Sequence, residues 1–192
     1  DYWVKGKEVY FKMHSISGFQ DAIEHQDVYV NNDGGIDTEN CGISQVNSCN
    51  KLRYALSRVY ATNDDDVRIH INGDYKPSTG ESFPISMLNN VSIEGSGATQ
   101  DQTVIDAEYS SGVFVFEDVE NVTISNLIIT GGMSTSSDTL GGGIYMNNTG
   151  EDVSLDNIMI KENSGAKGGG ISCYNNPYPI DLTDVTIKDN SS

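Results

Sequence analysis

The chain has 192 residues, of which 28 are acidic and 11 basic, so its formal net charge is −17. Such a charge argues against nucleic acid as a partner, because phosphate groups repel an acidic surface. The sequence contains no run of about 18 apolar residues, which excludes a membrane-spanning helix within it. Its apolar residues are regularly spaced, with glycine and asparagine between them, so the chain is not expected to be disordered.

The first segment of the chain, residues 1–26, contains one alternating stretch, Val9–Met13, followed by a break rich in serine and glycine. We predict an N-terminal strand packed on the protein. The alternatives are the last coil of a preceding domain and an arm that adds a strand to a neighbouring molecule.

Residues 27–66 are predicted to form an N-terminal cap. Residues 27–36 have the pattern of a strand and a turn, and a disulfide between Cys41 and Cys49 would close the short polar loop after them. Lys51–Tyr60 carries its apolar residues on one face, which suits a short amphipathic helix. A solenoid needs such a cover, because an open apolar end aggregates.

Residues 67–192 repeat one unit, which is the mark of a solenoid. Apolar and polar residues alternate within each copy, which indicates strands, and two-residue polar steps between the strands predict tight corners. The predicted inward columns are Val122/Val153/Ile180 and Ile124/Leu155/Leu182, and the predicted polar corner column is Asn126/Asn157/Asp184.

The first strand of each unit follows a glycine. The glycine runs at 141–143 and 168–170 are predicted to supply the backbone freedom for a sharp bend into this strand. Alignment on these glycines predicts the inward columns Val113/Ile144/Ile171 and Val115/Met146/Cys173. It leaves four aromatic residues on the outward face as a contact surface for sugars or proteins: Phe114, Phe116, Tyr145 and Tyr174.

Together these patterns predict an all-β fold, a right-handed parallel β-helix with a short N-terminal capping α-helix. Stacked coils would bring like residues to about 4.8 Å from one another along the axis. A βαβ protein would need amphipathic helices between the strands, and residues 67–192 contain none. We expect the coils over residues 67–192 to continue in a longer protein.

Two parts of the sequence resemble known families. The glycine-rich Gly141–Ile144 followed by Ile160-Lys-Glu-Asn163 resembles the repeats of polymorphic outer-membrane proteins, with glycine at the third position and isoleucine in place of phenylalanine. The segment from Val91 to Asp106 looks like the opening coils of pectin-lyase-like β-helices. The resemblance implies the fold, but the pectin-lyase-like superfamily contains lyases, hydrolases, adhesins and inert stalks.

No catalytic residues are predicted. A polysaccharide lyase needs an arginine or lysine base opposite Ca²⁺-binding aspartates, and all three arginines precede the clear repeats. Glu162 and Asp189 share an outward column beside Lys161 and Lys188, which indicates a solvated ladder of mixed charge. The three histidines have no metal-ligand spacing. Acidic clusters at residues 31–37 and 64–66 could hold Ca²⁺, but solvated acidic turns are favoured and no cofactor is expected.

Four sequons offer sites for N-glycans, and with the cysteine pair they favour a secreted or cell-surface location. We therefore expect a glycosylated structural or adhesive module of a larger surface protein or filament. Its expected partners are glycans or other surface proteins, with self-assembly through the N-terminal arm and the coil ends. The alternative is a polysaccharide-binding or polysaccharide-cleaving, pectate-lyase-like β-helix. The candidate glycosylation sites are Asn90, Asn121, Asn147 and Asn190.

Overall fold

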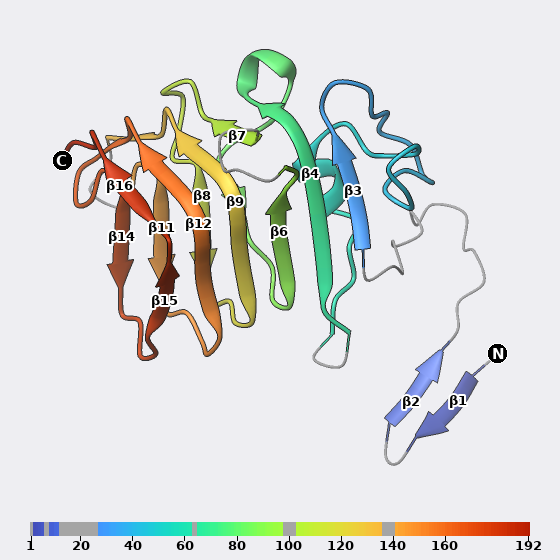
Figure 1. Ribbon diagram of the computed structural model, residues 1–192. Helices are drawn as coiled ribbons and strands as arrows, with labels where there is room; N and C mark the ends of the chain where they lie inside the picture. Colours follow the sequence, from blue (N-terminus) through green and yellow to red (C-terminus); the bar gives the residue numbers. More distant parts are fainter. Residues whose placement is uncertain (1, 6–7, 12–26, 63–64, 98–102, 136–140) are drawn as a thin grey trace.

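The computed structural model describes residues 2–5, 8–11, 27–62, 65–97, 103–135 and 141–192 (Figure 1). Strands β1 (Tyr2–Lys5) and β2 (Glu8–Phe11) pair antiparallel and form a sheet of their own. Most of the predicted N-terminal arm, residues 12–26, lies outside the described residues.

The rest of the described chain is a parallel β-solenoid, as predicted. Its larger sheet, here called the front sheet, has the order β3-β4-β6-β9-β12-β15, with β7 pairing β4 and β9, and β16 pairing β12. These strands are β3 (Asp27–Asn31), β4 (Val67–Tyr75), β6 (Val91–Gly95), β7 (Thr103–Asp106), β9 (Val122–Thr130), β12 (Val153–Lys161), β15 (Ile180–Thr183) and β16 (Thr186–Lys188).

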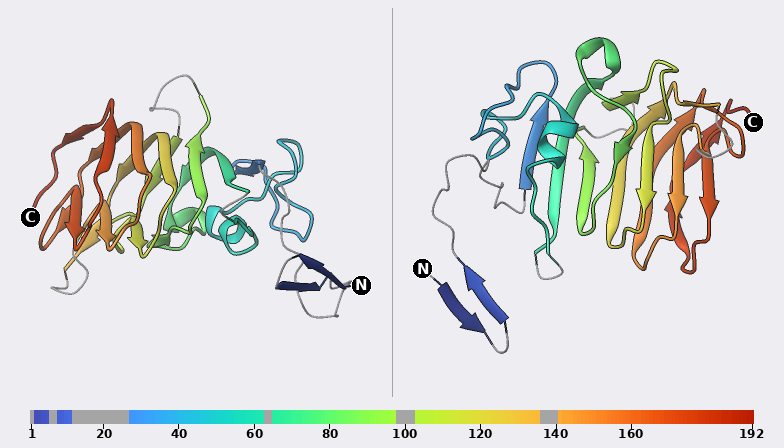
Figure 2. Two further views of the ribbon diagram at one scale, coloured as in Figure 1. Left: turned by 90° about the horizontal axis from the view of Figure 1, so that it is seen from below. Right: turned by 180° about the vertical axis from the view of Figure 1, so that it is seen from behind.

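A second sheet, here called the rear sheet, has the order β5-β8-β11-β14, and a small third sheet pairs β10 with β13. In Figure 1 the chain rises along the front strands, descends along the rear ones and advances toward the C-terminus, so the solenoid is right-handed (Figures 1 and 2). The strands are β5 (Ile85–Ser86), β8 (Phe114–Glu117), β10 (Met133–Ser134), β11 (Ile144–Asn147), β13 (Ser164–Gly165) and β14 (Ile171–Tyr174).

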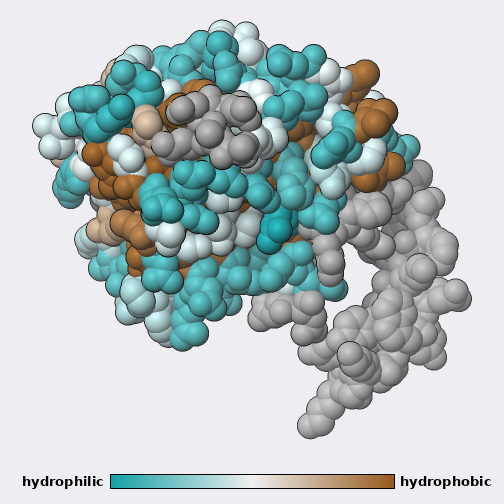
Figure 3. Space-filling view, viewed as in Figure 1, coloured by the Kyte–Doolittle hydropathy of each residue, from teal (hydrophilic) through white to brown (hydrophobic). Residues whose placement is uncertain are grey.

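The inward columns of the front sheet are confirmed. Val153 lies opposite Val122 and Ile180, and Leu155 opposite Ile124 and Leu182. The residues of β9 and β12 in these columns are buried, whereas Leu182 in the last winding is 53% exposed, because no further winding covers it in the structure. Apolar atoms accordingly gather at the C-terminal end of the solenoid in Figure 3.

The predicted polar corner is also confirmed. Asn126, Asn157 and Asp184 have φ angles of 59°, 48° and 51°, in the left-handed region that asparagine and aspartate tolerate best after glycine. Asn157 Nδ2 donates to Asn126 Oδ1 at 2.8 Å, so the corner is bonded from winding to winding. β9 and β12 each continue across this corner as one strand of nine residues.

At residues 141–143, glycine is required for a different physical reason from the predicted one, whereas Gly168 of the second run has a positive φ of 158°. None of Gly141–Gly143 has a positive φ. A side chain would instead collide with the next winding, since a Cβ on Gly142 would lie 2.4 Å from the carbonyl oxygen of Ser164. Space between backbones, and not flexibility, therefore requires glycine here.

The predicted register of β8 is wrong by one residue. In β8, Phe114 and Phe116 lie opposite Ile144 and Met146, so both phenylalanines point inward and are 1% and 0% exposed. Val115 takes the outward place opposite Tyr145. The slip arises because the amide of Phe114, not of Val113, donates to the carbonyl oxygen of Gly143. The two rings fill the core where later windings carry smaller side chains.

Cys173 lies opposite Met146 as predicted, with 3.9 Å between the two sulfur atoms. It is exposed, however, because it belongs to the last winding, and its predicted burial in the core stack is wrong. Desolvation on its inner side raises the pKa of the thiol above its ordinary value.

The strand of the predicted N-terminal cap, β3, pairs with β4 over five residues and so continues the front sheet. Helix α1 (Leu52–Leu56) is shorter than the predicted 51–60, but it buries the expected apolar face. A guanidinium nitrogen of Arg53 donates to Pro84 O at 3.4 Å, so α1 lies beside the residue that precedes β5. The chain also forms a 3-10 turn, η1 (Pro77–Thr79).

Candidate functional site

The loop closed by the cysteines, residues 41–49, covers the first edge of the front sheet and is here called the Cys loop. The predicted disulfide between Cys41 and Cys49 is confirmed, and neither cysteine is exposed. The Tyr29 amide donates to Gly42 O at 2.9 Å, and the Cys49 amide donates back to Tyr29 O at 2.9 Å. The loop thus bonds the edge of β3, which would otherwise be open to pairing with another chain.

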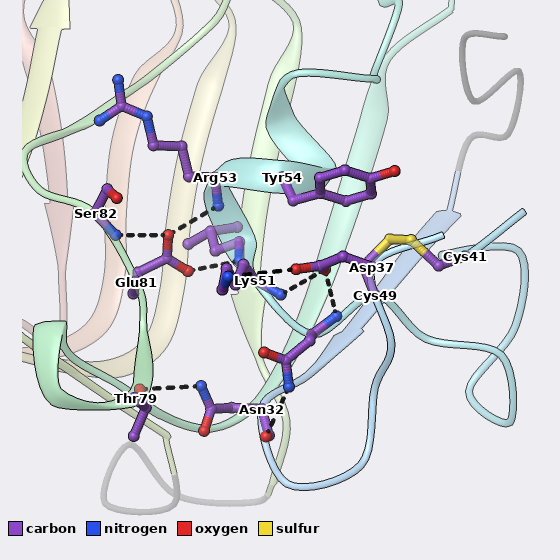
Figure 4. A network of polar contacts seen from close by, with 12 residues as sticks. Asn32, Asp37, Cys41, Cys49, Lys51, Arg53, Tyr54, Thr79, Glu81 and Ser82 are labelled. Atoms are coloured by element: carbon purple, nitrogen blue, oxygen red, sulfur yellow. Dashed lines mark hydrogen bonds and ion pairs between the residues drawn. A yellow bond between two sulfur atoms is a disulfide. The ribbon is translucent and has the colours of Figure 1, made fainter. Parts of the chain in front are cut away.

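Two carboxylates anchor the segment that follows the Cys loop (Figure 4). Asp37 Oδ1 accepts from the amides of Asn50 and Lys51 at 2.9 and 3.1 Å. Glu81, 4% exposed, accepts from the Leu52 amide at 2.7 Å at the start of α1. Burial raises the pKa of Glu81 above its ordinary value, against the opposing effect of these backbone hydrogen bonds. The cap is therefore a fixed part of the solenoid.

A groove of about 410 Å³ lies between the Cys loop and the outward face of β3 and β4, and we call it the front groove. This volume is within the range of small-molecule sites in proteins, about 300–1,000 Å³. Figure 3 shows that the surrounding face of the front sheet is mostly hydrophilic. The groove is lined by Tyr29, Val30, Asn31, Gln45, Ser48, His70, Ile71, Asn72 and Ser96.

His70 joins three neighbouring strands beside this groove. Its ring stacks on Tyr29 with 5.1 Å between the centroids. Its Nε2 lies 2.8 Å from Asp27 Oδ1 on β3, and its Nδ1 lies 3.5 Å from Glu94 Oε2 on β6. Arg68 also pairs with Glu94, at 3.9 Å. These side chains hold the first windings together across their outer surface.

Three polar groups of the front groove have no hydrogen-bond partner among the described residues. They are the hydroxyl of Tyr29, the side-chain amide of Gln45 and the amide nitrogen of Asn72, whose Oδ1 accepts from Ser96 at 2.8 Å. Next to Gln45, Val46 is 99% exposed at the tip of the Cys loop. The groove thus offers uncharged donors and acceptors beside an apolar tip.

Of the four aromatic residues predicted on the outward face, two lie there and two do not, and contact with sugars or proteins stays a prediction. Tyr145 and Tyr174 lie on the outward face of the rear sheet, whereas Phe114 and Phe116 belong to the core. Desolvation, with a smaller effect of Glu117, raises the pKa of the Tyr145 hydroxyl. Tyr145 borders a second groove of about 280 Å³, here called the rear groove, which also includes residues 84, 110–112, 114–115, 133–135 and 141.

The sequon asparagines take part in the bonding between windings. Asn121 Nδ2 donates to Asp66 and to Asn90, which uses both of its amide hydrogens, and Asn90 is buried. Asn190 Nδ2 donates to Ile160 O. Asn147 Nδ2 has a single, long hydrogen bond of 3.5 Å, to Glu117. Glycosylation of any of them stays a prediction, and Asn147 has the least to lose by it.

The groups considered for catalysis and metal binding are dispersed. Lys161 and Lys188 are aligned on β12 and β16 as predicted, and Lys161 pairs with the neighbouring Glu162 at 3.6 Å. Of the acidic clusters, Asp37 binds backbone amides and Asp66 binds Asn121. Within the described part of the chain, no group of three histidine, cysteine, aspartate or glutamate side chains is placed so that it could hold a metal ion. No helix of these residues is long and apolar enough to cross a membrane.

Sequence reasoning missed the front groove. The alternation of β3 and β4 could have placed Tyr29 and His70 outward in neighbouring windings, because Val28 and Val30 align with Ile69 and Ile71. The position of Gln45 depends on how the Cys loop folds back, which no periodic pattern reports. Comparisons with protein-family models, with curated proteins and with solved structures found no match.

Proposed function

We propose that this chain is an extracellular structural module of the adhesive kind, part of a larger cell-surface protein or filament. The supporting observation is the disulfide-held Cys loop, which presents a polar groove and the exposed Val46 from a rigid support. Exposed apolar residues beside polar groups are typical of contact surfaces. A disulfide with both sulfurs buried suits an oxidising compartment.

The outward side chains of the windings support a structural role. Thr123 and Ser154 hydroxyls lie 2.8 Å apart, and Asn148 Nδ2 donates to Asp118 Oδ1 at 2.7 Å. These groups bind winding to winding along the axis. We propose that the partners are glycans or other surface proteins, and that N-glycosylation, where it occurs, falls on Asn147.

Two measurements test this proposal. Antibodies raised against the folded chain should label intact source cells without permeabilisation, and labelling only after permeabilisation would contradict a surface location. Beads coated with the chain should adhere to cells or extracellular matrix more than beads coated with the reduced, unfolded chain. Equal adhesion of the two would contradict the adhesive role.

A second candidate is a polysaccharide-binding or polysaccharide-cleaving β-helix, which the rear groove beside Tyr145 favours. Incubation with acidic polysaccharides and Ca²⁺ tests cleavage, through the appearance of new reducing or unsaturated chain ends. Their appearance would make this candidate the better one.

A further inference from the structure

We infer that the front groove binds an uncharged sugar chain through hydrogen bonds from Tyr29, Gln45 and Asn72. This inference rests on the proposed adhesive function and names the ligand of its contact surface. It depends on three features of the groove: its prior organisation, the chemistry of its walls and the charge around it.

The groove is organised before any ligand arrives. Gln45 stands on a loop closed by a disulfide, and the same loop is hydrogen-bonded to both sides of Tyr29 on β3. The Tyr29 ring is fixed against His70, whose two nitrogens lie within 2.8 and 3.5 Å of carboxylates. A ligand therefore meets fixed walls, and little ordering entropy opposes its binding.

Besides the imidazole of His70 and the aliphatic Val30 and Ile71, the residues that line the groove carry amide and hydroxyl groups, and none of them carries a carboxylate or an ammonium group. Asp27 and Glu94 stand beside the groove, but neither lines it, and both bind His70. Uncharged groups of this kind exchange hydrogen bonds with sugar hydroxyls, which both donate and accept. They cannot compensate the desolvation of a ligand that carries a full charge.

The surrounding charge selects further among sugars. The chain has a formal net charge of −17, and two carboxylates flank the groove at His70. Their field repels uronates and sulfated sugars. A neutral oligosaccharide meets neither this repulsion nor the cost of burying a charge.

The test is isothermal titration calorimetry of the folded, disulfide-bonded chain with four neutral hexasaccharides, of cellulose, xylan, mannan and amylose type. Hexagalacturonate and a chitosan hexamer serve as the anionic and cationic probes. We expect at least one neutral hexasaccharide to bind, and to bind more tightly than either charged probe.

Matched variants place the site. Tyr29→Phe removes only the hydroxyl and keeps the stacking on His70, and Asn72→Ala removes the free amide. Each should weaken binding by about two- to tenfold, the effect of one hydrogen bond. Tyr145→Phe makes the same change on the rear sheet and should leave the affinity within twofold.

Three results would overturn the inference: no neutral sugar bound, tighter binding of a charged probe, or full affinity in the Tyr29→Phe/Asn72→Ala double variant. Bead adhesion measured on the same double variant separates a failure of this inference from a failure of the proposed adhesive function. If adhesion persists while neutral sugars do not bind, the ligand is wrong and the adhesive function stands. If the unchanged chain does not adhere at all, the proposed function itself fails.

Discussion

Replacing Asn163 with alanine tests how the windings are joined at the glycine-rich corner. Asn163 is 1% exposed, and its Oδ1 accepts from the Gly132 amide at 2.8 Å. Its Nδ2 donates to Ile129 O at 3.1 Å and to Lys161 O at 2.9 Å. The Asn of the Ile-x-x-Asn motif therefore bonds its own winding to the preceding one from inside the core.

The alanine variant leaves a buried amide without a partner and removes hydrogen bonds from two carbonyl oxygens. An unsatisfied buried donor costs about 1–3 kcal/mol and each lost hydrogen bond about 1 kcal/mol, so we expect a loss of about 3–5 kcal/mol in the free energy of unfolding. For a chain of this size that corresponds to a fall in Tm of about 6–20 °C.

Urea and thermal unfolding followed by circular dichroism measure this loss. Ser154→Ala is the matched control, because it removes a hydrogen bond of the same winding, to Thr123, on the partly exposed outer face. We expect the control to lose at most about 1 kcal/mol. An Asn163→Ala variant that is no less stable than Ser154→Ala would refute the view that the corner asparagine joins the windings.

Three further perturbations probe the cap and the corner. Replacing both Cys41 and Cys49 with serine should lower the free energy of unfolding by about 2.5 kcal/mol, since the disulfide closes a loop with a sequence separation of 8; an unchanged urea midpoint would contradict this. Gly142→Ala puts a Cβ 2.4 Å from a carbonyl oxygen of the next winding and should sharply reduce Tm, whereas Gly34→Ala, with nothing nearer than 4.0 Å, should not; equal effects would be inconsistent with close packing. Burial raises the pKa of Glu81 above 4.5, so the folded chain favours the protonated carboxyl group. The protonated group therefore contributes stability below pH 4.5, and this contribution is lost as the pH rises through the raised pKa. Glu81→Gln should therefore gain stability relative to the unchanged chain across that rise, and parallel pH–stability curves for the two would argue against a raised pKa.

Side-chain period and corner chemistry were readable from the amino acids alone. The alternation around Val122, Val153 and Ile180 gives each strand one apolar face. A chain of short strands buries such faces by stacking equal units into a solenoid. The corner column consists of asparagine and aspartate, which tolerate the left-handed backbone conformation that the corner has. The short polar loop between Cys41 and Cys49 likewise predicted the disulfide that joins them.

The register of β8 could not be read in the same way. Gly112 invites alignment with Gly143, but hydrogen bonds between windings place Phe114 opposite Ile144, and one residue of slip exchanges the two faces of a strand. The space in the core decides between the two registers, because both phenylalanine rings fit inside this winding. An alignment of repeats does not report how much space lies inside a winding.

The sequence by itself determined the solenoid, its corners and its disulfide, because each depends on local spacing that repeats along the chain. Only the tertiary structure decided which aromatic residues face the solvent and that the Cys loop folds over β3 to form the front groove. Tyr29 and Asn72 lie on the alternating strands β3 and β4, whereas Gln45 stands on a loop outside that alternation. Their meeting follows from hydrogen bonds between the loop and a strand edge, and such contacts between distant segments leave no periodic trace in the order of the amino acids.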